Sequence, residues 1–129
     1  MKKRTLMLAV ASVFFASLIP AVQAQDAAPF VGTWNGTVFL PGMELDFTMK
    51  ISLNEEKKLI GTIDVPDQGA MDLPLANFEI EGKWITFIID HPSVLGDPTF
   101  MGELDDTGKK ITGTYTQSGG ELDFTAEKE

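Results

Sequence analysis

The chain has 129 residues, no cysteine, and 19 acidic against 10 basic side chains, which give a formal net charge of −9. A chain of this length suits one domain with a modest core, and without cysteine its stability must come from burial rather than from disulfides. So acidic a protein should bind neither nucleic acid nor an anionic membrane surface, because it repels both and releases no counterions.

The N-terminus predicts export. Three basic residues precede an apolar run from Leu6 to Ile19, and Val22-Gln23-Ala24 places small residues where signal peptidase cleaves. The run is too short for a comfortable membrane span. Cleavage would remove the three cations and change the formal charge from −9 to −12. We expect a periplasmic or extracellular protein with no membrane span after cleavage, divided into a signal peptide at 1–24, a linker at 25–31 and a β-domain at 32–129.

The first predicted hairpin spans residues 33–53. Strand 33–40 ends at the turn Pro41-Gly42, and strand 44–53 then alternates apolar and polar residues without a break. Such alternation is typical of an antiparallel sheet with one buried and one hydrated face. The positions assigned to the buried face are Trp34, Gly36, Val38, Leu40, Leu45, Phe47, Met49, Ile51 and Leu53.

The next two strands differ in their regularity. Strand 59–65 keeps one parity, whereas strand 73–80 begins with Leu73 inward and resumes with Phe78 inward, an odd number of residues later. Because a slip of one residue turns side chains to the opposite face, we expect a β-bulge near Ala76-Asn77.

The fifth strand carries two alternating apolar sets, so its parity is ambiguous. We assign Ile85, Phe87 and Ile89 to the interior, which leaves Trp84 and Ile88 on the outer face.

A repeat ends the chain. The segment 36–48 returns as 113–125 without a gap, and both copies end in Glu-Leu-Asp-Phe-Thr. Each copy has the pattern of a β-hairpin around a glycine-containing turn. With a sixth strand at 99–105, the sequence predicts eight short strands in sequential hairpins. We therefore predict an all-β fold, an eight-stranded antiparallel up-and-down β-barrel that closes its own edges.

Four glycines fall on the predicted inner face: Gly36, Gly61, Gly102 and Gly113. Interior glycines suit a sharply coiled sheet, and the alternative is that they line a ligand cavity. A barrel of eight strands is just wide enough for side chains to fill it or for one small ligand, and we favour the filled interior. No inward Arg or Lys is predicted to hold a carboxylate, so an interior ligand should be neutral and apolar.

The segment Gly32-Thr33-Trp34 resembles the Gly-x-Trp opening of lipocalin-like and avidin-like barrels, in which the tryptophan plugs one end. The similarity extends through Gly36, Ile60-Gly61 and Ile111-Thr112-Gly113-Thr114. This pattern resembles the small lipocalin-like β-barrel domain that precedes an α/β-hydrolase domain in bacterial exported proteins. The resemblance implies a calycin-like meander. The sequence ends at Glu129, where the hydrolase would begin, so the activity of that family is not expected here.

No catalytic constellation is recognisable, and we expect no enzyme activity, cofactor or metal site. The only histidine, His91, lies in a loop before Pro92, and no Gly-x-Ser-x-Gly elbow supplies a nucleophile. The aspartates that could hold a cation stand at turns without the spacing of a calcium loop, and we interpret them as turn formers. They are Asp64, Asp67, Asp72, Asp105 and Asp106.

Two functions stay open. Trp84, Ile88 and Met101 take the outward parity on neighbouring strands and should form one apolar patch. We therefore expect, first, an exported non-catalytic module that docks through this patch onto another protein or a second copy. The alternative is a carrier of a small neutral apolar ligand inside the barrel, where Tyr115 is the one polar contact.

Overall fold

A computed structural model describes residues 27–129, and the predicted signal peptide at 1–24 lies outside these residues. Within the described chain, no helix is long and apolar enough to cross a membrane. The elements, in chain order, are the 3-10 helix η1 (Ala28–Phe30), the strands β1 (Gly32–Leu40), β2 (Met43–Leu53) and β3 (Leu59–Val65), the 3-10 helix η2 (Pro66–Gln68), and the strands β4 (Ala70–Glu81), β5 (Trp84–Ile89), β6 (Thr99–Leu104), β7 (Lys110–Gln117) and β8 (Gly120–Lys128).

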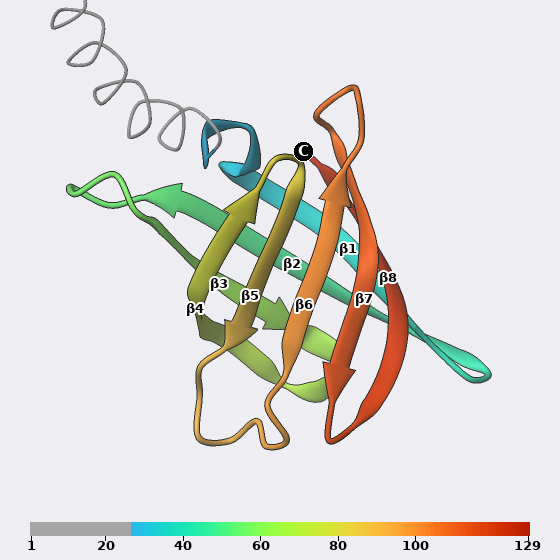
Figure 1. Cartoon of the computed structure of the whole chain (residues 1–129). Helices are drawn as coiled ribbons and strands as arrows, with labels where there is room; N and C mark the ends of the chain where they lie inside the picture. The colour runs from blue at the N-terminus through green and yellow to red at the C-terminus, as the bar shows by residue number, and fades with distance from the viewer. Residues whose placement is uncertain (1–26) are drawn as a thin grey trace, which may run out of the picture.

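Each strand pairs antiparallel with the next one in the chain, and β8 pairs with β1, which closes the sheet into a barrel (Figure 1). This confirms the predicted eight-stranded up-and-down architecture. Because every strand from β1 to β8 has a partner on both sides, the barrel presents no sheet edge that another chain could extend.

The connections between strands gather at two ends of the barrel. The β4–β5 and β6–β7 turns lie at the end where the chain terminates, near η1 (Figure 1). The β5–β6 loop and the β7–β8 turn lie at the opposite end (Figure 1). We call the first the closed end and the second the open end.

The two copies of the repeat form the β1–β2 and β7–β8 hairpins in the same register. Gly36 lies opposite Phe47 in the first copy, and Gly113 lies opposite Phe124 in the second. A Cβ added at Gly36 would lie 2.3 Å from Cζ of Phe47, and one at Gly113 would lie 1.9 Å from the backbone oxygen of Met101. Both glycines are therefore required by the close approach of neighbouring groups, which is the first of the two roles predicted for them.

The predicted strand parities agree with the burial of the side chains, with one exception. The register of β4 against β5 shifts between Ala76 and Glu79, and Asn77 has a positive φ of 57°, which confirms the β-bulge. Ile85, Phe87 and Ile89 of β5 are buried as expected. Leu53 was assigned to the interior and is instead 39% exposed. It is the last residue of β2, where the strand has passed the rim of the barrel.

The closed end is sealed by Trp34. Its side chain is fully buried, and its indole N–H donates a hydrogen bond of 2.9 Å to the backbone oxygen of Phe30 in η1. The ammonium of Lys128 lies 5.1 Å from the ring of Trp34 and donates to the backbone oxygen of Pro29 at 2.8 Å. The segment predicted as a linker thus contributes η1 and the buried Phe30 to this end of the barrel.

An aromatic cluster fills the middle of the barrel around Phe100. Its ring centroid lies 4.7 Å from that of Tyr115, 5.1 Å from Phe124, 5.2 Å from Phe87 and 5.5 Å from Phe47. These separations are those of favourable tilted and stacked aromatic pairs. The cluster divides the tightly packed closed end from the open end.

Candidate functional site

The open end of the barrel is hollow. A cavity of about 430 Å³ lies on the far side of the aromatic cluster from Trp34, within the size range of small-molecule sites. The prediction that side chains fill the interior is therefore confirmed at the closed end and wrong at the open end. The lining residues are Val38, Leu40, Leu45, Phe47, Ile63, Val65, Gln68, Ala70, Leu73, Ile89, Ser93, Val94, Leu95, Phe100, Tyr115, Gln117 and Leu122.

No charged side chain of the described residues lines this cavity. Its polar groups are the amides of Gln68 and Gln117 and the hydroxyls of Ser93 and Tyr115. A charged ligand would lose its hydration here without gaining an opposite charge, which is a large cost in an apolar site. None of the four inward glycines lines the cavity, so the second role considered for them is not supported.

Tyr115 and Gln117 form the polar side of the cavity. The Tyr115 hydroxyl donates to Oε1 of Gln117 at 2.8 Å, and Nε2 of Gln117 donates to the backbone oxygen of Leu95 at 2.7 Å. Burial raises the pKa of Tyr115 to about 12, so the phenol is protonated at neutral pH. The phenol oxygen can also accept a hydrogen bond, and the Gln117 amide has a second N–H. The pair can therefore orient one polar group of a ligand.

The repeat shows where this polar side comes from. Tyr115 and Gln117 occupy the positions that Val38 and Leu40 occupy in the first copy, and all four side chains line the cavity. The first copy thus presents an apolar wall and the second a polar one. The sequence identified Tyr115 as an interior polar group, whereas the role of Gln117 was missed, although its alignment with Leu40 could have indicated an inward position.

The β5–β6 loop covers part of the opening. Val94 and Leu95 line the cavity from this loop, although Leu95 is 74% exposed and so lies at the rim. Beside the Gln117–Leu95 hydrogen bond, the backbone N–H of Ser118 donates to the oxygen of Gly96 at 2.7 Å. Both hydrogen bonds join the loop to the β7–β8 hairpin, so the mouth of the cavity depends on contacts between segments distant in the sequence.

His91 is engaged within its own loop. Its Nδ1 lies 2.7 Å from the hydroxyl oxygen of Ser93 and accepts the backbone N–H of Ser93 at 3.1 Å. These contacts fit the turn role predicted for His91, because they tie the ring to a residue two positions along the chain. The expected absence of catalysis stays a prediction.

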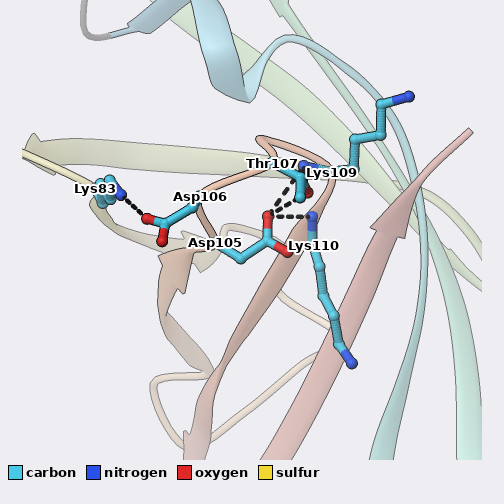
Figure 2. A network of polar contacts seen from close by, with 6 residues as sticks. All are labelled: Lys83, Asp105, Asp106, Thr107, Lys109 and Lys110. Atoms are coloured by element: carbon cyan, nitrogen blue, oxygen red, sulfur yellow. Dashed lines mark hydrogen bonds and ion pairs between the residues drawn. The ribbon is translucent and has the colours of Figure 1, made fainter.

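The aspartates at the closed end take part in turns, as Figure 2 shows for the β6–β7 turn. The Asp105 carboxylate accepts from the Thr107 hydroxyl at 2.8 Å and from the backbone N–H groups of Lys109 and Lys110 at 3.2 and 3.3 Å. These hydrogen bonds, that of Thr107 above all, lower the pKa of Asp105.

Two further contacts involve aspartates of the predicted set. Lys83 from the β4–β5 turn pairs with Asp106, which raises the pKa of Lys83, and both side chains are exposed to solvent (Figure 2). Near the end of β3, the Asp64 carboxylate accepts the backbone N–H of Asp72, near the start of β4, at 2.7 Å. Within residues 27–129, no group of three or more acidic or histidine side chains is placed to hold a metal ion.

The predicted outer patch is smaller than expected. Trp84 and Met101 are 45% and 48% exposed, whereas Ile88 is half-buried and so contributes less to the outer surface. Thr86 lies between Trp84 and Ile88 and pairs with Met101, so Trp84 and Met101 are diagonal neighbours on adjacent strands. Of the predicted site residues, Tyr115 lies in the cavity and the others lie on the outer surface.

Comparison with known proteins shows no family for this chain: no family model matches it, and no curated protein matches its sequence.

Proposed function

We propose that this protein binds a small, neutral, mainly apolar molecule in the open end of its barrel. The observation that carries this proposal is the cavity of about 430 Å³, whose lining is apolar apart from four uncharged polar side chains. A concave apolar site with a few convergent polar groups is the usual form of a small-molecule site.

The cavity chemistry narrows the class of ligand. Apolar parts of the ligand would displace water from Val38, Leu45, Val65 and Leu122, which is favourable in proportion to the area buried. One hydroxyl or carbonyl group on the ligand would meet the Tyr115–Gln117 pair. A carboxylate or an amine would be disfavoured, because the described lining offers neither charge as a partner.

The proposal also includes the location and the class of the protein. We propose an exported, non-catalytic binding module, in the periplasm or outside the cell, that is related to the lipocalin-like barrel domains of bacterial exported proteins. The signal-like N-terminus and the closed barrel with a tryptophan at one end support this proposal.

A matched pair of fluorescent probes tests the ligand class. N-phenylnaphthylamine is neutral and apolar, and anilinonaphthalenesulfonate has the same ring system with an added sulfonate. We expect the neutral probe to bind one site per chain and the sulfonated probe to bind at least about tenfold more weakly, a difference of about 1.4 kcal/mol. Equal binding of the two probes would contradict a neutral cavity.

A pair of leucine variants locates that binding. Leu122→Trp should fill the cavity and weaken binding of the neutral probe by at least about tenfold. Leu59→Trp is the control, because Leu59 is also a half-buried strand leucine but does not line the cavity. If both variants weaken binding of the neutral probe, or if neither does, the probe does not bind in this cavity.

The outer surface favours a second function, docking onto a partner protein. Trp84 and Met101 are large apolar side chains exposed as diagonal neighbours on the barrel wall. An exposed tryptophan flanked by another apolar side chain is typical of a binding anchor. The two functions use different faces and do not exclude each other.

A further inference from the structure

Trp84 stands between two carboxylates on the outer wall of the barrel. It pairs with Glu81 on one side and with Glu103 on the other, so both acids lie directly across from it on neighbouring strands. Directly opposed side chains on one face of a sheet are in contact distance, with Cβ atoms about 5 Å apart. The tryptophan ring is therefore held within a row of negative charge.

A shallow groove runs beside this row. It has a volume of about 330 Å³ and contains a third carboxylate, that of Glu79, opposite Thr86. The neighbouring lysine, Lys83, forms its ion pair with Asp106 of the β6–β7 turn, and Glu103 raises the pKa of Lys83 less than Asp106 does. The residues that line the groove are Glu79, Ile80, Glu81, Trp84, Thr86 and Met101.

The two tryptophans of the chain differ in their contact with a cation. The ring of Trp34 has the Lys128 ammonium 5.1 Å from its centroid, a cation–π contact made within the chain. Within residues 27–129, no lysine or arginine of this chain lies over Trp84 in the same way. Instead its ring is exposed and surrounded by acids, an arrangement that favours a cation supplied from outside.

We infer that the Trp84 groove docks a basic segment of a partner protein, in which a lysine or arginine side chain lies across Trp84 and its charge faces Glu81 and Glu103. This inference rests on the docking role proposed above. Met101 would contact the aliphatic stem of that side chain, as apolar surfaces do for long cationic residues. A second copy of this chain is a poor occupant, because its net charge of −9 would repel the acidic groove.

Titration calorimetry on the wild-type chain tests the inference. The probes are a short peptide of alternating lysine and leucine and the corresponding peptide of glutamate and leucine. We expect saturable binding of the lysine peptide, weakened at least about tenfold in Trp84→Thr and weakened by added salt. The glutamate peptide should show no binding.

Charge variants separate a specific site from general attraction to an acidic protein. The double variant Glu81→Lys with Glu103→Lys should abolish binding of the lysine peptide. The control Glu55→Lys with Glu56→Lys makes the same change of net charge in the exposed β2–β3 turn and should retain most of the binding. An equal loss in both double variants would overturn the inference.

Two further outcomes distinguish the inference from the docking role on which it rests. If both peptides bind and Trp84→Thr weakens both equally, the surface docks partners but has no preference for cations, and only the inference fails. If neither peptide changes the heat signal, the docking role fails with it.

Discussion

The two copies of the repeat have the same register but make different walls of the barrel. In both hairpins a glycine lies opposite a buried phenylalanine, Gly36 with Phe47 and Gly113 with Phe124. Toward the open end the copies diverge, because Val38 and Leu40 correspond to Tyr115 and Gln117. The shared positions build the packed centre, and the changed positions give the cavity one apolar and one polar side. One hairpin pattern therefore provides both the support and the specificity of a site.

The largest expected effect concerns the shared positions. Phe124→Ala should lower the free energy of unfolding by about 3–5 kcal/mol, because it opens a closed void in the aromatic cluster. Phe47→Ala should cost a similar amount, toward the lower end of this range, because Phe47 already borders the open cavity and its loss enlarges that space. Urea denaturation of both variants and of the wild type measures these changes in the free energy of unfolding. A Phe47→Ala variant that unfolds at the wild-type midpoint would contradict the shared role of the two phenylalanines.

A smaller effect is expected at Tyr115, one of the positions at which the two copies differ. Tyr115 is the only tyrosine, so its ionisation can be followed directly by ultraviolet absorbance. Burial raises its pKa from 10.0 to about 12. Because the folded pKa is the higher one, the stability that Tyr115 contributes is complete below pH 10 and is lost as the pH rises to about 12.

The measurement is a pH titration with circular dichroism as the control for folding. We expect a midpoint near 12 in the folded chain and near 10 in urea. Saturating N-phenylnaphthylamine should move the folded midpoint further upward, since the probe excludes water from the phenol. A folded midpoint near 10 would show that Tyr115 is not buried in the cavity.

The fold could be predicted from the sequence because strand alternation and burial depend on the same local pattern. The odd spacing from Leu73 to Phe78 was sufficient to place the bulge, since parity has only two values. The outward position of Trp84 was likewise confirmed, because it follows from the choice of Ile85 as a buried residue. The exception, Leu53, lies at a strand end, where alternation continues but the core does not.

The cavity could not be predicted in the same way. Its volume depends on how far Phe47 and Phe100 reach from the aromatic cluster and on where the β5–β6 loop lies. That loop is held by hydrogen bonds from Gln117 and Ser118. These bonds join residues far apart in the chain, and they leave no periodic pattern in the sequence. The acidic row around Trp84 was missed for a similar reason, because it appears only when the registers of β4, β5 and β6 are combined.

The measurement that tests the central claim most directly is a methyl NMR titration with N-phenylnaphthylamine. The account predicts saturable shifts of the methyl groups at the open end, those of Leu45, Val65 and Leu122, which line the cavity. The methyl groups of Ile51, Ile85 and Ile111 in the packed closed end should keep their positions. Shifts confined to the closed end, or no saturable shift at either end, would contradict a binding site in the open end of the barrel.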